Sequence, residues 1–383
     1  MNAVKEYATG MELQQKFDQL FKELDVMVER HDEIRAVLVA LLSGENSLFV
    51  GDPGTGKTML IESLSKVFEA FGINSMYYHL MNENSEKDEL FGPLNIMKMR
   101  EGKRVHETDG YLPSAAVACL DEIFKSSPAV LNMLLRMLNE GVFVNGNERV
   151  QCPLLAGFAA SNEWPDSKKN LDALFDRFVI RKTVKPVVSA AGLKRLMWDS
   201  DADLTPDVTV RLSPQDVYEA RRVIRDLIWQ TDAVACIEEI LKQVEAEGIK
   251  VGNRRRRKAV KVARANAYLN GSAEVRPQDL DILSAVLWAI PGEEEEVVGK
   301  IVTKLANSVE MRIGGWLEQA REIAKNANIV TLAEATAVGQ KLQDIFLKLT
   351  EHSNESPRAE AAAKEVTHLI SEVSYQTVGN DLS

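Results

Sequence analysis

Residues 51–58 combine glycines with a lysine and a threonine in an order that is typical of phosphate binding. They read GDPGTGKT and follow the apolar run 47–50, which matches the G-x-x-x-x-G-K-[ST] pattern. Backbone N–H groups can surround a triphosphate only where the chain approaches it closely, and glycine permits that approach. We predict that Lys57 binds the β- and γ-phosphates and that Thr58 binds Mg²⁺. The other predicted contacts are Gly51, Asp52, Pro53, Gly54, Thr55 and Gly56.

Two adjacent acids, Asp121 and Glu122, follow a second apolar run at 116–120. A short, continuously apolar run is typical of a strand that is buried on both faces of a parallel sheet. Ligands bind at the carboxyl ends of such strands. We therefore expect Asp121 to help hold Mg²⁺ and Glu122 to polarise an attacking water. The simpler alternative is a pair of exposed acids at the end of a strand.

Two further residues could complete a hydrolytic site. Asn162 ends the apolar run 154–161 and could orient the water, although an Asn in this position is also a common turn residue. Arg177 lies between apolar residues at the predicted edge of the nucleotide domain, and from there it would reach the γ-phosphate of a neighbouring subunit only in an oligomer. An ion pair with Asp172 or Asp176 in the same chain is the alternative.

Apolar periodicity predicts the elements that would position these residues. Two helices are expected within 11–43, and a helix after the loop carries Leu60, Leu64, Val67 and Phe71. Downstream we expect a strand at 73–80, a small projecting hairpin near 90–108, a helix from Pro128 capped by Ser126 or Ser127, a hairpin at 142–150 and a strand at 154–161.

Composition limits the classes of function. The 383 residues are 45% hydrophobic and 27% charged, as in a globular chain of two or three domains. A net charge of -11 argues against a protein that coats nucleic acid or an anionic membrane. Cys119, Cys152 and Cys236 are isolated, and neither a signal peptide nor a membrane-spanning run is recognisable. We expect a cytoplasmic protein without a membrane span.

Helix-forming residues dominate after Pro186, with predicted helices at 190–198, 214–229 and 232–246. The run 254–258 is strongly basic. A solvated helix face is the expected role of Arg256, Arg257 and Lys258, and nucleic-acid binding is the alternative. From residue 291 onward, spacings of three and four predict a helix hairpin or short coiled coil around 332–349 and a further helix at 359–374.

Together these motifs resemble the AAA+ ATPases, and within them the MoxR family, with the closest likeness to its RavA branch. The likeness covers about residues 20–290 and depends on GDPGTGKT at 51–58, ELFGPLNI at 89–96, GYLPSA at 110–115, LDEIFKSSPAVLNMLL at 120–135, AASNE at 159–163 and ALFDRFVIR at 173–181. It implies an α/β fold in which a P-loop AAA+ core, a parallel sheet flanked by helices, carries a helical lid domain, and the helical spacings after residue 291 add a C-terminal helical extension. The implied domains are 1–186 with a helix-2 insert near 90–108, the lid at 187–290, and the extension at 291–383.

The resemblance also assigns roles to single residues. Asn162 matches sensor 1, Arg177 matches the arginine finger, and Arg255 aligns best with the sensor 2 arginine, with Arg254 as the alternative. It implies ATP and Mg²⁺ as cofactors and a homo-oligomer in the form of a hexameric ring. The RavA branch also has a small β-rich domain for which this chain has no length, so the known partners of that branch are not transferred.

The predicted function is Mg²⁺-dependent ATP hydrolysis that remodels or activates a protein client. Family analogy suggests a von Willebrand-type partner or a metal-dependent enzyme as the client. Two other classes remain open. The chain could be a nucleic-acid motor or loader, although its charge makes nucleic acid an unfavoured partner, or it could be a scaffold that binds ATP and seldom hydrolyses it.

Overall fold

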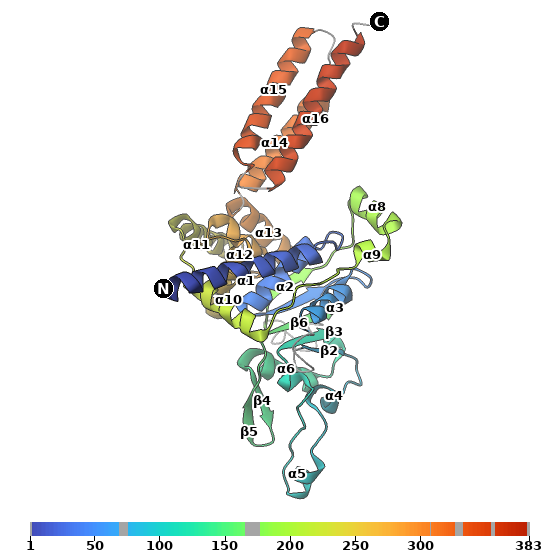
Figure 1. The fold of residues 1–383 in the computed structure, drawn as a ribbon, viewed down its shortest axis with the longest axis vertical. Coiled ribbons are helices and arrows are strands. Elements are labelled where there is room, and N and C mark those ends of the chain that lie inside the picture. Colours follow the sequence, from blue (N-terminus) through green and yellow to red (C-terminus); the bar gives the residue numbers. More distant parts are fainter. Residues whose placement is uncertain are drawn as a thin grey trace. The chain divides into compact units, whose positions relative to one another are not determined.

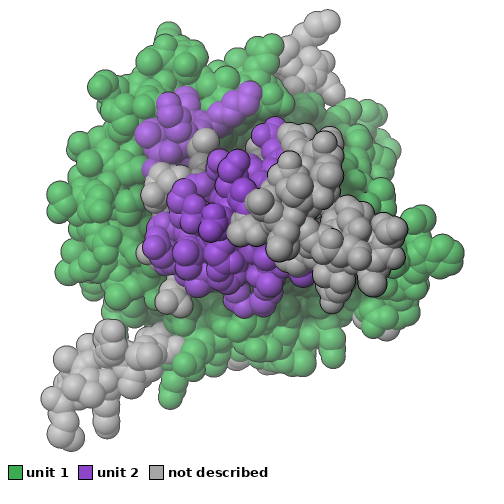
Figure 2. Space-filling model, turned by 90° about the horizontal axis from the view of Figure 1, so that it is seen from above, with its two compact units in different colours: residues 1–299 green, residues 300–383 purple. Residues whose placement is uncertain are grey.

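The computed structural model describes residues 2–68, 76–164, 177–306, 308–325, 332–353 and 357–380. The chain divides into two compact units, residues 1–299 and 300–383, which Figure 2 distinguishes by colour. Each unit has its own buried core and is described separately below. The finer division predicted at residues 186 and 290 stays a prediction.

A five-stranded parallel sheet forms the centre of the first unit (Figure 1). The order β2-β3-β6-β1-β7 places β1 between β6 and β7. All residues of β1, β3 and β6 are buried, as their continuous apolar runs predicted. The predicted α/β fold class is confirmed. The strands are β1 (Asn46–Val50), β2 (Met76–Leu80), β3 (Val117–Asp121), β6 (Ala156–Ser161) and β7 (Phe178–Thr183).

Helices flank this sheet where the periodicity predicted them. They are α2 (His31–Ser43), α3 (Lys57–Phe68) and α6 (Pro128–Glu140), whereas α1 (Asn2–Leu24) packs on α2 and on other helices. The side chain of Ser127 caps α6 by accepting a hydrogen bond from Val130 N, and Gly141 ends the helix in the left-handed conformation. The first part of the predicted strand at 73–80 and the predicted helical position Phe71 lie outside the described residues.

Two segments extend side by side from one end of the α/β domain (Figure 1). The strands β4 (Val142–Asn145) and β5 (Glu148–Gln151) form the predicted hairpin. The predicted hairpin near 90–108 is instead two antiparallel arms, joined at the Leu94–His106 bridge, with the helix α5 (Ile96–Arg100) at its tip and α4 (Lys87–Phe91) before it. The side chain of Asn145 donates to His106 O and accepts from His106 N, at 3.0 and 2.7 Å, and so joins the two segments.

The rest of the first unit is helical, as predicted. Its α-helices are α8 (Ala190–Trp198), α9 (Asp201–Leu204), α10 (Pro214–Asp226), α11 (Thr231–Ala246), α12 (Asn253–Leu269) and α13 (Glu293–Ala306), the last of which crosses the division at residue 299. A 3₁₀ segment, η5 (Pro277–Ala285), packs on α12. The helix predicted at 214–229 ends at Asp226 because Trp229 pairs with Val275 in a parallel bridge.

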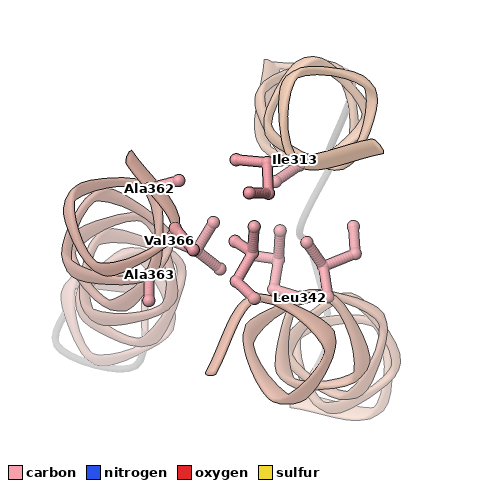
Figure 3. Packing of buried hydrophobic residues seen from close by; sticks show 9 residues of the cluster. Ile313, Leu342, Ala362, Ala363 and Val366 are labelled. Atoms are coloured by element: carbon pink, nitrogen blue, oxygen red, sulfur yellow. The ribbon is translucent and has the colours of Figure 1, made fainter. Parts of the chain in front are cut away.

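The second unit contains α14 (Ser308–Lys325), α15 (Leu332–Glu351) and α16 (Pro357–Asn380), which pack against one another. Ile313, Leu342 and Val366 point toward each other between these helices (Figure 3). The segment predicted as a helix hairpin or short coiled coil around 332–349 is the single helix α15, the further helix predicted at 359–374 is α16, and α14 supplies a third helix that closes the apolar core. No helix among the residues described in either unit is long and apolar enough to cross a membrane.

Candidate functional site

The loop 51–56 joins the carboxyl end of β1 to the first turn of α3, the arrangement that points backbone N–H groups at an anion. Its glycines are required by geometry. A Cβ on Gly51 would lie 2.2 Å from Val184 O, and Gly54 and Gly56 have φ values of 79° and 86°. The structure therefore gives a physical reason for each glycine of the sequence pattern.

Lys57 folds back over this loop. Its ammonium donates hydrogen bonds to Gly51 O at 2.6 Å and to Asp52 O at 2.8 Å. Burial lowers the pKa of Lys57, while the carboxylates of Asp121 and Glu122 act in the opposite direction. The lysine charge is thus held beside both the loop and the acids at the end of β3.

Thr58 and Asp121 form an oxygen pair across the site. The Thr58 hydroxyl donates to Asp121 Oδ2 at 3.1 Å, and Asp121 Oδ1 accepts from the backbone N of Glu122 at 2.9 Å. Magnesium prefers oxygen ligands and is usually held by one or two protein groups together with water and phosphate oxygens. The hydroxyl and the carboxylate of this pair fit such an ion.

Glu122 and Asn162 lie together at the carboxyl ends of the neighbouring strands β3 and β6. The Glu122 carboxylate accepts hydrogen bonds from the side-chain amide of Asn162 and from its backbone N, and it lies 3.5 Å from Lys125 Nζ. Glu122 is 8% exposed and has a φ of 53°, a left-handed conformation that is unfavourable for a residue with a side chain. The fold therefore holds this carboxylate in a constrained position next to a side-chain amide.

A cavity of about 610 Å³ opens beside the loop. Its walls combine loop residues 52–56 with apolar side chains from three other places in the first unit. These side chains are Met27, Val28, Met59, Pro186, Val187, Leu193, Leu196 and Leu204. Apolar walls next to a phosphate-binding loop suit the flat base of a nucleotide.

Arg30 is a residue of this site that the sequence analysis missed. It is 6% exposed, and its guanidinium donates to Thr55 O and to Lys185 O, both at 2.8 Å, as well as to Glu29 O. It therefore connects the loop to the segment that follows β7. The available signal was a charged pair, Glu29 and Arg30, in the short turn between two apolar helices.

Glu29 continues this connection toward α8. It has a φ of 54°, and its carboxylate accepts hydrogen bonds from the backbone N of Val188 at 3.0 Å and of Ser189 at 3.1 Å. The hydrogen bond with the Ser189 side chain, followed by that with the Val188 backbone, lowers the pKa of Glu29. The carboxylate thus lies at the first turn of α8, where a negative charge is favourable.

Arg177 lies far from the loop within one chain. It directly precedes β7, an edge strand that runs parallel to β1 with Phe178 level with Asn46. The loop follows the opposite end of β1, a strand of five residues, so about 16 Å of strand separates the two. Arg177 therefore lies beside an edge strand, and its role as an arginine finger stays a prediction. Asp172 and Asp176, the alternative partners, lie outside the described residues.

The structure does not bring Arg255 or Arg254 to the loop cavity. Arg255 is 9% exposed and donates to Val286 O at 2.7 Å, inside the helical part of the first unit. Arg254 is exposed and lines a separate cavity together with Glu45 and Lys258. Neither arginine is among the residues that line the cavity beside the loop.

A parallel sheet in which an inner strand, β1, ends in this loop, followed by a helical region, defines a P-loop nucleotide-binding protein of the AAA+ type. Comparison with protein-family models supports this class. Residues 12–213 match the MoxR domain of the MoxR-vWA-beta-propeller ternary systems, and residues 227–302 match an AAA lid domain. The chain therefore belongs to the MoxR family of AAA+ ATPases. Membership implies that it binds a nucleotide together with a divalent metal ion.

Similar proteins include two from Methanocaldococcus jannaschii that are described as uncharacterised. MJ0812 is 35% identical over 77% of this chain and 76% of its own length. MJ0079 is 31% identical over 89% of this chain and 86% of its own length. A structural protein of Acidianus two-tailed virus, ORF618, is 31% identical over 73% of this chain and half of its own length. A solved protein of Cytophaga hutchinsonii, described as a candidate ATPase, has a TM-score of 0.60 at 19% identity, over 80% of this chain and 98% of its own, and supports the fold.

Proposed function

We propose that this chain hydrolyses ATP with Mg²⁺ at a site shared between two copies of the chain in a ring, and that turnover remodels or activates a protein client. The observation that carries the proposal is the placement of the Glu122–Asn162 pair beside the Thr58–Asp121 pair at one edge of the sheet. One pair offers oxygen ligands for a metal, and the other offers a carboxylate for a water.

Each group has a separate task in the proposed reaction. The loop amides and Lys57 bind the phosphates, and Thr58 with Asp121 holds the metal. Magnesium at that place would neutralise charge on the phosphate oxygens. Glu122 polarises the water whose oxygen attacks the γ-phosphorus while the bond to the β-phosphate oxygen breaks. Asn162 orients the Glu122 carboxylate through its amide.

The proposed ring follows from the position of Arg177. Because it lies at the opposite end of the sheet from its own loop, its guanidinium would stabilise the charge of the transition state only at a neighbouring subunit. A hexamer is the assembly that the family resemblance implies. Arg255 is proposed for the sensor 2 role only after the helical lid moves, since its guanidinium now bonds to Val286 O.

A protein client is supported by the two projecting segments. Ile96, Met97 and Met99 at the tip of the insert are 68%, 65% and 47% exposed. Exposed apolar side chains of this kind are suited to transient contacts with unfolded or apolar protein surfaces. The description of the matching family model makes a von Willebrand-type protein a candidate partner. The cytoplasmic location stays a prediction.

Glu122→Gln tests the proposal. The amide preserves the shape of the side chain and loses the basic oxygen, so we expect ATP to bind normally while phosphate release slows about a hundredfold or more. The matched control is Glu238→Gln, an exposed position on α11. Wild-type protein that binds ATP tightly but does not release phosphate would instead support the scaffold alternative, and stimulation by nucleic acid would support the motor.

A further inference from the structure

The first unit has a second large cavity, of about 770 Å³, on the helical side of the molecule. It lies between α10 and α12, above the last turn of α2. No acidic side chain among the described residues lines it, although the whole chain carries a net charge of -11. The cationic side chains that line it are Arg221, Arg222, Arg225, Arg257, Lys261 and Arg264. We call this cavity the basic groove.

The cations form two rows along packed helices. Arg221 and Arg225 are one turn apart on α10, and Arg257, Lys261 and Arg264 follow one another at helical spacing on α12. Such spacings place side chains on one face of each helix. Each row extends for about 6–10 Å at 1.5 Å per residue. The positive charge therefore extends over a longer distance than a single small anion could contact.

Arg221 and Arg257 contribute positive charge that no carboxylate of the described residues pairs with directly. Arg221 is half-buried, and its guanidinium donates to two carbonyl oxygens, Leu41 O at 2.6 and 3.1 Å and Leu155 O at 2.8 Å. Burial lowers the pKa of Arg221 to about 10, so the side chain remains a cation at neutral pH. Arg257 is exposed and makes no ion pair with the described part of the chain.

The carboxylates near these cations compensate little of their charge. Glu45 lies 3.2 Å from Lys261 and 2.7 Å from Lys258, so one acid is shared between two lysines. Asp226 lies 3.3 Å from Arg225, but both side chains are about 70% exposed and water screens the pair. The groove keeps an excess of positive charge.

The floor of the groove is apolar. Leu42 and Ile224 are buried beneath it, and Val260 and Tyr218 remain 36% and 48% exposed at its sides. A ligand that uses the whole groove must therefore present both negative charges and apolar side chains. A peptide segment with acidic and apolar residues meets that requirement, whereas a sugar-phosphate backbone would leave the apolar floor unused.

We propose that the basic groove binds an acidic, partly apolar peptide segment of another protein. Its carboxylates would pair with the rows on α10 and α12, and its apolar side chains would cover Val260 and Tyr218. Nucleic acid fits less well because Tyr218 is the one aromatic side chain among the described lining residues and the net charge of the whole chain is negative. Binding to this groove does not depend on ATP turnover.

The test is fluorescence anisotropy without nucleotide. The probe is a labelled peptide of about 12 residues with Glu on one face and Leu and Phe on the other, long enough to span the groove as a helix. We expect saturable binding that weakens with salt and falls at least about tenfold in the double variant Arg225→Glu, Arg257→Glu. The control, Lys242→Glu with Lys250→Glu, changes the net charge equally at exposed positions outside the groove and should bind like the wild type. Melting temperatures check that both variants fold.

Three other outcomes would overturn the proposal. The first is no saturable binding of the peptide, or equal loss in the control variant. The second is tighter binding of an oligothymidylate than of the peptide, which would make the groove a nucleic-acid site. The third is unchanged peptide affinity in Val260→Ser and Tyr218→Ser together with competition by tripolyphosphate, which would indicate a site for phosphate groups alone.

Discussion

Replacing Arg30 by Met should weaken both the fold and nucleotide binding, because this side chain connects the phosphate-binding loop to the segment after β7. Met keeps much of the length and removes the donors. Two of the lost hydrogen bonds, to Thr55 O and Lys185 O, join parts of the chain that are distant in sequence. A hydrogen bond from a charged donor contributes about 1.5–3 kcal/mol, and because water from the adjacent cavity can hydrate the two carbonyls we take the lower value for each. The free energy of unfolding should then fall by about 3 kcal/mol.

Two assays measure the effects of this substitution. A loss of about 3 kcal/mol lowers the melting temperature of the first unit, residues 1–299, by roughly 5 °C, at an unfolding entropy of about 2.1 cal/mol/K per residue. The affinity for ATP should fall severalfold, since the loop must then be ordered by the nucleotide at a cost of about 1 kcal/mol. Arg30→Lys keeps the charge but not the planar set of guanidinium donors. Its melting temperature and ATP affinity should lie between those of Arg30→Met and the wild type.

The control for Arg30 is Arg211→Met, which removes an exposed arginine whose hydrogen bonds go only to Val208 O and Val210 O nearby. It should leave both the melting temperature and the ATP affinity close to wild type. Arg30→Met protein with the melting temperature and ATP affinity of the wild type would refute the connecting role that we assign to this residue.

Two further substitutions address single groups of the site. Lys57→Ala should abolish tight binding of a fluorescent ATP analogue, because the phosphate charge loses its nearest cation, and wild-type affinity would remove Lys57 from the phosphate site. Glu29→Gln should destabilise the protein at neutral pH and not in acid, because the pKa of Glu29 is lowered in the folded state. The carboxylate therefore stabilises the fold at pH values above the unfolded-state pKa, and this stabilisation is lost as the pH falls through the folded-state pKa. Denaturant titrations at a series of pH values from neutral into acid should show the difference between variant and wild type shrinking, and a difference independent of pH would contradict this role for the carboxylate.

Local sequence patterns were sufficient for the central part of the site. The loop 51–58 and the acids at 121 and 122 follow continuous apolar runs, and such runs become buried parallel strands whose carboxyl ends meet at one edge. The same reasoning placed Asn162 at the end of β6, next to Glu122. The chemistry of these residues depends on where the strands end, which short-range patterns predict well, and on the strand order, which the structure supplies.

Contacts between distant segments could not be predicted in this way. Arg30 reaches Thr55 and Lys185 because a turn, a loop and a linker converge in space, and no periodicity encodes that convergence. The basic run at 254–258 showed only that α12 is charged, whereas the groove also needs Arg221, Arg222 and Arg225 from α10. The tip of the insert was predicted as a hairpin because α5, of five residues, is too short to produce a helical period.

The central claim is that ATP is hydrolysed at a site shared between two copies of the chain. Arg177→Ala removes the finger from every interface, and Glu122→Gln removes the carboxylate that polarises water from every site, so each homogeneous assembly should be nearly inactive. An assembly that contains both variants has some interfaces where the Arg177 of one subunit meets the Glu122 of the other.

The most direct test is therefore the ATPase rate of co-expressed, co-purified assemblies that contain both variants. The account predicts that phosphate release reappears in these mixtures, to a fraction of the wild-type rate, while each variant alone remains inactive. Arg177→Ala protein that assembles normally and hydrolyses ATP at the wild-type rate would contradict it.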